Sequence, residues 1–280
     1  MNRRKDKTIY FKTDEDIEMM RHSCKLVSKT LGFVAGMLRE GITGAEVDKA
    51  AEAYIRDHKA TPSFKGLYGC PSSLLISKNS AVVHGIPNKD PFKIGDILSI
   101  DCGTTLNGWV GDCAYTFVIG QTTPEALRLL RTTNEALYLG IAQAHTGMRV
   151  GDISFAVQRH CESRKYGVVR DLVGHGVGRS LHEAPEVPNY GKKGNGPLLK
   201  NGMTIAIEPM INMGTREVRQ AKDKWTIVTL DGKPSAHYEH TVAVRPNKAE
   251  ILTTHQYIEE SVKKNSELFD ITEKMTTFAA

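Results

Sequence analysis

Two histidines in the stretch "GHGVGRSLHEAPEVPNY", residues 174 to 190, could bind a metal ion or a substrate. His182 is followed at once by a glutamate, which suggests the start of an HExxH zinc site. That site needs a second histidine one helical turn later, but Glu186 stands there. Pro185 also lies within the turn and would break a helix. The glycines around His175 lack the GxGxxG spacing of a phosphate-binding loop. From these residues alone, both histidines could equally be solvated or structural.

Several carboxylates occur where apolar strand patterns end. Asp101 ends the run "DILSID", and Glu208 ends "MTIAIE". An Asn107-Gly108 pair predicts a tight hairpin, which pairs Gly103 with Asp112 and places Asp101 on the same face, roughly 7–8 Å away. Two carboxylates separated only by a glycine would repel each other, and a buried charge is costly without a compensating cation.

Carboxylates with an imidazole are the ligands of hard or borderline divalent metals, and two such ions about 3.5–4 Å apart need bridging carboxylates. Asp101, Asp112, Glu208 and Glu239 with one histidine could saturate such a pair. Each residue alone also has an ordinary structural interpretation. An aspartate near a turn is commonly a turn residue, and Glu239 could be an exposed position of an alternating strand.

The elements that must position these residues occur in two similar series. The first series has predicted helices at 14–40 and 43–58, followed by strands at 73–77, 81–85, 96–101 and 109–119. The second has helices from Thr123 to about His145 and from Asp152 to about Lys165, and strands "VVRDLVGHG", "MTIAIEP", "WTIVTL" and "HYEHTVAV".

Three short segments repeat between the two series in nearly constant register. "GITGAEVDKAAE" from residue 41 is echoed by "GMRVGDISFAVQ" from 147, "KIGDILSID" from 93 by "KNGMTIAIE" from 200, and "HGIP" from 84 by "HEAP" from 182. This repetition predicts an α+β domain of two similar halves.

Composition limits the protein class. The chain has 280 residues, 40% of them hydrophobic, a formal net charge of +5 and a pI near 8.8, so a disordered chain is not expected. We see no signal peptide and no membrane-spanning run. The five cysteines are odd in number without a CxxC pair, which favours reduced thiols and a cytoplasmic protein. Part of the surplus charge lies in Arg3, Arg4, Lys5 and Lys7, which predicts a basic tail over 1–9 that is disordered or contacts the ribosome.

Five motifs, in order and spacing, resemble the type I methionine aminopeptidases from about residue 10 to 250: "HGIP", "DCGTTLNGWVGDCAYTF", "GHGVGRSLHEAP", "GMTIAIEPM" and "YEHTV". The resemblance implies the duplicated pita-bread (creatinase/aminopeptidase) fold, an α+β architecture with two pseudo-symmetric halves around a central antiparallel sheet. It also implies one catalytic domain over 10–254, with halves at about 10–120 and 121–254. Residues 255–280 are then a tail or surface helix.

The same resemblance implies a role for each site residue. Asp112 and Glu239 bridge two divalent ions, Asp101 completes one metal site, and His175 and Glu208 complete the other. Glu208 accepts a proton from a water held between the ions, and His84 and His182 contact the substrate. Co, Mn, Fe and Zn all suit these ligands. The implied reaction removes the initiator methionine from nascent polypeptides, and nothing in the sequence requires a partner, so a monomer is expected.

The expected methionine pocket departs from the family pattern. Leu67 and Cys70 stand where the family often has tyrosines, whereas Trp225 matches its pocket tryptophan. A change of about one methylene shifts selectivity by only about 1–3 kcal/mol, so methionine stays the expected side chain and a broader preference is an alternative. Two further alternatives are a binding protein on the same fold without catalysis, and a related metallopeptidase that cleaves before proline. The latter commonly carries an extra N-terminal domain, whereas only about ten residues precede the first predicted helix here.

Overall fold

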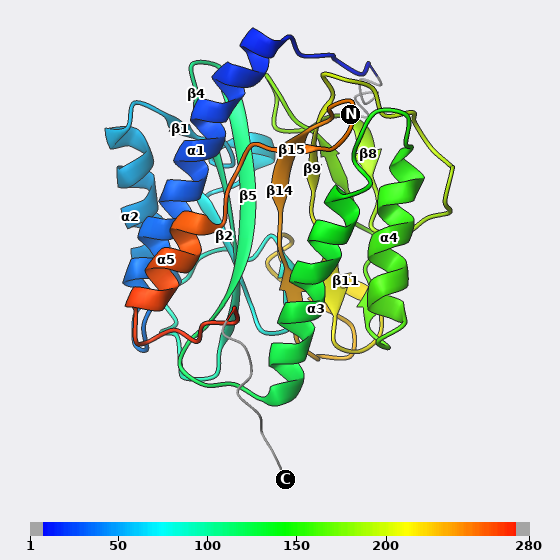
Figure 1. Ribbon diagram of the computed structural model, residues 1–280. Helices are drawn as coiled ribbons and strands as arrows, with labels where there is room; N and C mark the ends of the chain where they lie inside the picture. Colours follow the sequence, from blue (N-terminus) through cyan, green and yellow to red (C-terminus); the bar gives the residue numbers. More distant parts are fainter. Residues whose placement is uncertain (1–7, 273–280) are drawn as a thin grey trace.

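The computed structural model describes residues 8–272, and its helices form two pairs over the strands (Figure 1). Helices α1 (Asp14–Met37) and α2 (Gly44–Asp57) belong to the first half, and α3 (Pro124–Ile141) and α4 (Val150–Glu162) to the second. Figure 1 shows the first pair on the left and the second on the right, with β5 (Trp109–Val118) and β14 (His240–Ala243) running between them. This arrangement is the two-halved α+β architecture that the sequence predicts.

The helices begin at capping residues that the sequence predicts. Thr13 and Asp16 form a capping box for α1, and Thr43 and Glu46 form one for α2, so each box satisfies backbone N–H groups that have no partner within the helix. The expected start of α4 at Asp152 is wrong by two residues. Asp152 instead lies within the first turn, where its carboxylate accepts from the N–H of Arg149 at 2.8 Å.

The first-half sheet places β4 (Ile97–Leu106) between β5 on one side and β1 (Thr61–Pro62) and β2 (Leu74–Lys78) on the other. The Asn107-Gly108 hairpin has the predicted register. Leu106 pairs with Trp109, and Gly103 pairs with Asp112. Asp101 therefore lies on the same face as Asp112, because alternate residues of a strand share a face.

The second-half sheet has the order β15 (Glu250–Ile251), β14, β9 (Thr204–Ile207), β7 (Gly174–Gly176), β8 (Glu183–Val187). Two smaller sheets complete the fold. One joins β13 (Ser235–His237), β10 (Met210–Asn212) and β6 (Gly167–Val168), and the other joins β11 (Val218–Gln220), β12 (Ile227–Thr229) and β3 (Ala81–Val83). The latter sheet contains strands of both halves.

Two strands predicted as continuous are each split. "VVRDLVGHG" forms β6 and β7 with a loop between them, and "HYEHTVAV" contributes to β13 and β14, which belong to different sheets. The second break falls at Tyr238 and Glu239, where the chain passes from one sheet to the other. There the N–H of Glu239 donates to the carbonyl of Ala114 on β5 at 3.0 Å. A contact between halves, invisible in the local pattern, therefore ends the strand.

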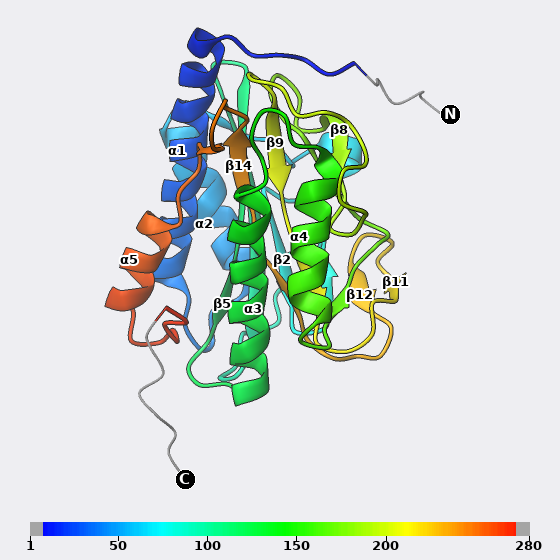
Figure 2. The same cartoon turned by 45° about the vertical axis from the view of Figure 1, so that its right-hand side comes forward.

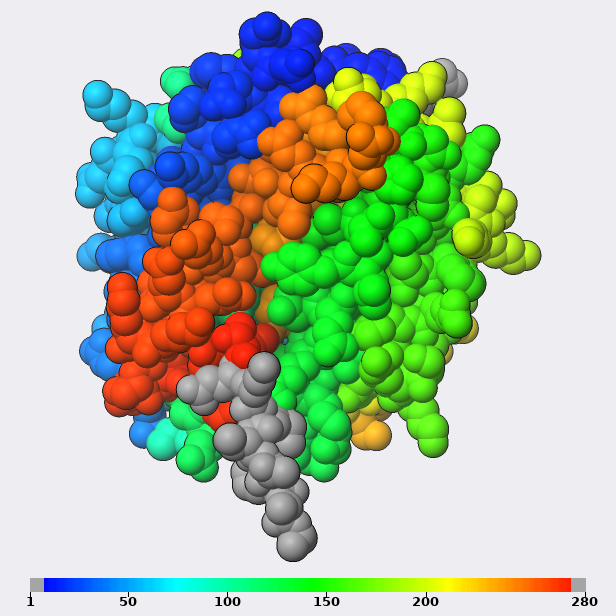
Figure 3. Space-filling model, in the orientation of Figure 1, coloured from blue at the N-terminus to red at the C-terminus, as the bar shows by residue number. Residues whose placement is uncertain are grey.

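The last helix, α5 (Gln256–Lys264), packs on the first. Its Ile258 and Val262 are buried, and the Tyr257 carbonyl lies so close to Gly32 of α1 that a Cβ there would approach it to 2.8 Å. Figure 2 shows α5 beside α1, and the space-filling view shows this orange and red segment between the blue α1 and the green α3 (Figure 3). Over residues 8–272, none of the helices combines the length and apolar character needed to cross a membrane.

Candidate metal centre and active-site cleft

Every residue that the sequence suggests for the site lines one cleft of about 2140 Å³. This is larger than the roughly 300–1,000 Å³ of a typical small-molecule pocket, so the cleft has room for an extended peptide. The basic residues Arg3, Arg4, Lys5 and Lys7 lie outside the residues that the structure describes.

The β4–β5 hairpin supplies two carboxylates to the floor of the cleft. Asp101 lies on β4 and Asp112 on β5, with Gly103 paired to Asp112. Gly103 is packed so closely that a Cβ would lie 2.9 Å from the side chains of Ser63 and Phe64. The absence of a side chain here allows the preceding loop to close over the hairpin without displacing either aspartate.

The second half supplies two glutamates. Glu208 directly follows β9, and Glu239 lies in the break between β13 and β14. The side chain of Glu208 is 13% exposed, and Glu239 is only 2% exposed. Asn189 fixes the backbone at Glu208 by donating its Nδ2 hydrogen to the Glu208 carbonyl at 2.9 Å.

His175 faces these carboxylates from β7. Its Nδ1 donates to the carbonyl of Gly176 at 2.9 Å, which leaves Nε2 to point at Glu208 Oε1 (3.4 Å) and Asp112 Oδ2 (3.6 Å). The flanking glycines serve packing rather than phosphate binding. A Cβ at Gly174 would lie 2.4 Å from the Ala206 carbonyl, and one at Gly176 would lie 2.2 Å from the Ala184 carbonyl.

Burial determines the charge state of this group. It raises the pKa of Asp101 to about 7 and that of Glu208 to about 8, and it raises the pKa values of Asp112 and Glu239 well above normal, where neighbouring carboxylates add to the effect. Burial lowers the pKa of His175 to about 3. His175 is thus a neutral imidazole, because desolvation and the neighbouring His182 both disfavour its charged form.

The donor atoms match what a divalent cation requires. Ligand atoms of Asp112, His175 and Glu239 all lie within 4.8 Å of one another. Asp101 Oδ1, Asp112 Oδ1 and Glu239 Oε1 are buried with no hydrogen-bond partner, which is costly for carboxylates. A bound cation removes both this cost and the mutual repulsion of the carboxylates.

His182 lies above this centre. Its ring contacts the ring of His175 edge-on, with centroids 4.5 Å apart. The next residue, Glu183, forms an ion pair with Lys12, in which Oε2 lies 2.5 Å from Nζ and both side chains are almost fully buried. The segment before α1 is thereby joined to the loop that carries His182.

His84 approaches from the first half, directly after β3. Its backbone has φ 60, an uncommon left-handed conformation for a non-glycine residue. Gly85 packs tightly on β2, where a Cβ would lie 2.2 Å from the Ile76 carbonyl. This close packing fixes the backbone after His84, so the imidazole lines the cleft.

The three expected pocket residues lie in one apolar cluster beside the metal ligands. Cys70 is buried, Leu67 and Trp225 are half-buried, and Phe64 and Leu181 belong to the same cluster. All five line the cleft. The cluster therefore provides an apolar wall for an uncharged side chain.

Sequence reasoning missed two residues of the cleft. His237 is 2% exposed, and its Nε2 lies 3.7 Å from Glu208 Oε2. It stands two residues before Glu239, a spacing that could have suggested a shared strand face. Tyr68 is 77% exposed, stacks on His182 with centroids 5.9 Å apart and has φ 53. No local pattern in the sequence predicts the contact between Tyr68 and His182, because the two residues are far apart in sequence.

Comparisons with known proteins identify the family and confirm the pita-bread fold that the resemblance implies. A model of metallopeptidase family M24 matches residues 18–246. The chain is 51% identical over 245 residues to the methionine aminopeptidase of Clostridium perfringens, covering 88% of this chain and 98% of that protein. It is 44% identical over 245 residues to methionine aminopeptidase 1 of Bacillus subtilis, covering 88% and 99%. The crystal structure of methionine aminopeptidase from Rickettsia prowazekii matches with a TM-score of 0.87 at 38% identity, covering 88% of this chain and 100% of that one.

Proposed function

The chain belongs to metallopeptidase family M24 and, within it, to the methionine aminopeptidases, and we propose that it removes the N-terminal methionine from nascent proteins and peptides. The observation that carries the proposal is the meeting of four carboxylates and one neutral imidazole at the floor of a peptide-sized cleft. A binding protein on the same scaffold has no need of this cluster, three of whose carboxylates carry buried oxygens with no hydrogen-bond partner.

The proposed metal centre holds two divalent ions. Asp112 and Glu239 would be shared by the two ions, Asp101 would complete one site, and His175 and Glu208 would complete the other. Buried oxygens of Asp101, Asp112 and Glu239 that lack a hydrogen-bond partner, together with the Nε2 of His175 that points at Glu208 and Asp112, support this assignment. When bound, such ions lower the pKa of a coordinated water and polarise the scissile carbonyl. Mn, Fe, Co and Zn are all compatible with these ligands.

The protein's own groups complete the chemistry. Glu208 accepts the proton of the attacking water at a carboxylate oxygen, His182 donates a hydrogen bond to the carbonyl oxygen that gains charge, and His84 hydrogen-bonds near the scissile nitrogen. The acidic floor of the cleft takes the free α-amino group of the substrate. This requirement restricts cleavage to chain ends.

The side chain of the first substrate residue enters the apolar cluster of Leu67, Cys70 and Trp225. These residues offer no charged partner, so an uncharged side chain such as methionine fits. Leucine and cysteine in place of two aromatic residues change the volume of the pocket, which leaves a broader residue preference as the second candidate.

We place the enzyme in the cytoplasm, because its five cysteines are all free and buried, as is usual for a protein kept in reducing conditions. We also propose that it is a monomer. The basic residues before Thr8 are proposed to contact the ribosome. Deleting residues 1–7 tests this while sparing Thr8 and Ile9, which line the cleft. We expect ribosome co-sedimentation to fall at low salt while hydrolysis of a free tripeptide is unchanged; unaltered sedimentation would remove the idea.

The decisive experiment measures release of the first residue from Met-Ala-Ser, Leu-Ala-Ser and a Met-Pro-containing peptide, with chelator-treated protein reloaded with Mn or Co. Metal-dependent release from Met-Ala-Ser, far faster than from Leu-Ala-Ser, is the expected result. Comparable leucine release would favour the broader enzyme. Metal binding without release from any peptide would contradict the proposal and favour a non-catalytic scaffold.

A further inference from the structure

The segment that follows β14 returns to the back of the metal centre. It lies beyond residue 246, where the family match ends. The N–H of Leu252 donates to the Thr241 carbonyl at 2.9 Å, and the N–H of Thr254 donates to Ser28 Oγ at 2.9 Å on α1. The segment then forms α5, and Asn265 Nδ2 donates to the carbonyls of Ala35 and Leu38 at the end of α1. These contacts fix residues 252–265 against β14 of the second half and α1 of the first.

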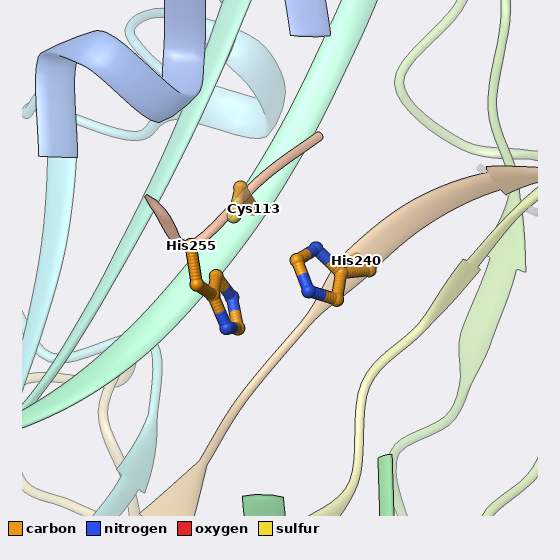
Figure 4. Close-up of side chains that lie close together, drawn as sticks. All are labelled: Cys113, His240 and His255. Atoms are coloured by element: carbon orange, nitrogen blue, oxygen red, sulfur yellow. The ribbon is translucent and has the colours of Figure 1, made fainter. Parts of the chain in front are cut away.

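His255, at the start of α5, reaches from this segment to the proposed metal ligand Glu239. It is 3% exposed, and its Nε2 donates to the Glu239 carbonyl at 3.2 Å. The thiol of Cys113 donates to the same oxygen at 3.3 Å. Figure 4 shows Cys113 on its strand with His255 and His240 beside it. Since Cys113 follows Asp112, these groups occupy the face of β5 opposite the cleft.

Glu239 depends on such contacts because it lies between two strands of different sheets. Its N–H donates to Ala114, and its carbonyl accepts only from Cys113 and His255 among the contacts of the described residues. A buried peptide group needs both partners. The peptide at Glu239 sets the direction of its side chain, so the donor that fixes the carbonyl also aims the carboxylate at the cleft.

Further contacts fix the orientation of His255. Its ring stacks on His240 with centroids 3.9 Å apart, and it meets the Tyr115 ring edge-on at 5.0 Å. His240 is itself held by Thr253 Oγ1 at 2.7 Å on Nδ1 and by the Tyr138 hydroxyl at 3.2 Å on Nε2. Burial lowers the pKa of His255 to about 4, so the ring is neutral and donates from Nε2.

Cys113, His240 and His255 could in principle hold a metal ion themselves, since their ligand atoms lie within 4.8 Å of one another. Their existing contacts argue against this. Both ring nitrogens of His240 are in hydrogen bonds, and Cys113 and His255 both donate to the Glu239 carbonyl. Burial also raises the pKa of the Cys113 thiol, which disfavours the thiolate that a metal binds. We therefore interpret the three as a hydrogen-bonded group behind the metal centre.

We propose that His255 is a positioning residue for Glu239, and that the C-terminal segment 252–265 thereby contributes to metal affinity. This inference rests on the proposed function, in which Glu239 bridges the two ions. Partners that orient a metal ligand typically affect affinity or activity by 10–100-fold when they are removed. The same range is expected for loss of the His255 hydrogen bond.

The test measures Mn²⁺ and Co²⁺ affinity of the full-length protein by competition with a chromophoric chelator, and the visible spectrum of the Co²⁺ form. His255→Gln and His255→Asn are both polar, but only the glutamine amide reaches the position of Nε2. We expect His255→Asn to bind metal at least about tenfold more weakly with an altered Co²⁺ spectrum, and His255→Gln to stay within about threefold of wild type. Val262→Ala is the control, because it removes buried packing of α5 without touching Glu239.

Equal affinity in wild type, His255→Asn and His255→Gln would overturn the inference. An equal loss in Val262→Ala would also overturn it, since the effect would then be general destabilisation. Glu239→Gln separates this failure from that of the proposed function. If Glu239→Gln binds metal as wild type does, the ligand assignment fails, and the role of His255 fails with it. If Glu239→Gln loses metal and the His255 variants do not, only the inference about His255 fails.

Discussion

His84 and Glu208 both line the cleft, but their different surroundings suit different tasks. Glu208 belongs to the buried group of carboxylates, with Oε1 3.4 Å from His175 and Oε2 3.7 Å from His237. His84 is not part of that group. Burial lowers its pKa, so it presents a neutral imidazole that can donate one hydrogen bond. Metal binding and substrate contact are therefore separable by mutation.

We expect His84→Ala to lower kcat for Met-Ala-Ser by about 10²–10⁴-fold while metal content stays at the wild-type level, because only a hydrogen bond to the reacting group is lost. Glu208→Gln is expected to abolish turnover and also to weaken metal binding, since the same carboxylate has both roles. Steady-state kinetics of the purified variants measures kcat, and elemental analysis measures their metal content. Wild-type turnover in Glu208→Gln would refute its assignment as proton acceptor.

The proposed pocket residues are uncharged, so we expect them to act on a substrate through contact area rather than charge. Trp225 is half-buried against the apolar cluster that lines the cleft. We expect Trp225→Ala to reduce kcat/KM for Met-Ala-Ser by about tenfold or more, mainly through a higher KM, because contacts to the bound side chain are lost. Phe155→Ala is the control, an exposed aromatic residue on α4 outside the cleft. Equal effects of the two substitutions would show that Trp225 does not contact the substrate.

At the scale of elements, close backbone packing requires glycine at particular positions. Gly174 and Gly176 let β7 lie between β8 and β9 with His175 pointing at the carboxylates, and Gly85 lets the chain after His84 pack on β2. Gly32 plays a similar part in the contact between α1 and α5. In each case the neighbour is a backbone atom, which cannot move aside as a flexible side chain can.

Gly32 and Gly36 of α1 form a matched pair for testing this packing. A Cβ at Gly32 would lie 2.8 Å from the Tyr257 carbonyl oxygen, whereas nothing lies within 4 Å of one at Gly36. We expect Gly32→Ala to lower the free energy of unfolding by about 1–3 kcal/mol through overpacking. Gly36→Ala should raise it by about 0.5–1 kcal/mol, because alanine favours a helix. Urea denaturation measures both, and equal stabilities would contradict the packing of α5 on α1.

At the scale of the whole molecule, the two halves meet at a group of acids that the metal-free protein can bury only by protonating them. The folded-state pKa values of Asp101 (about 7) and Glu208 (about 8) exceed the unfolded values near 4, so the folded state binds more protons between those limits. The contribution of these acids to stability is present at low pH and is lost as the pH rises through 7 and 8. Below about pH 6.5, buried neutral histidines act in the opposite direction, because unfolding lets them take up protons.

We therefore expect the chelator-treated protein to become less stable as the pH rises from 6.5 to 8.5. Thermal unfolding should show a falling Tm over that interval, and added Mn²⁺ should stabilise more at pH 8.5 than at 6.5. Glu208→Gln removes one of the titrating acids and should flatten the slope. A Tm that is independent of pH in the metal-free wild type would argue against a fully buried acidic centre.

Local features of the sequence determined a large part of this structure. The hairpin register that aligns Gly103 with Asp112 follows from Asn107-Gly108 and the two-residue period of strands, and the helix starts follow from capping residues. The placement of Asp101 and Asp112 on one face of the hairpin was also predictable, because alternate residues of a strand share a face. Each of these inferences uses interactions between residues close in sequence or paired across one turn.

Only the tertiary structure decided the rest. It places His237 beside Glu208, Tyr68 on His182 and His255 behind Glu239, and it splits the predicted strand at Tyr238 and Glu239. The physical reason is the same in each case. In each case a peptide carbonyl, an aromatic ring or a carboxylate contacts a residue that is distant in sequence. Such a contact forms only when both halves are folded, so the periodicity of the sequence cannot predict it.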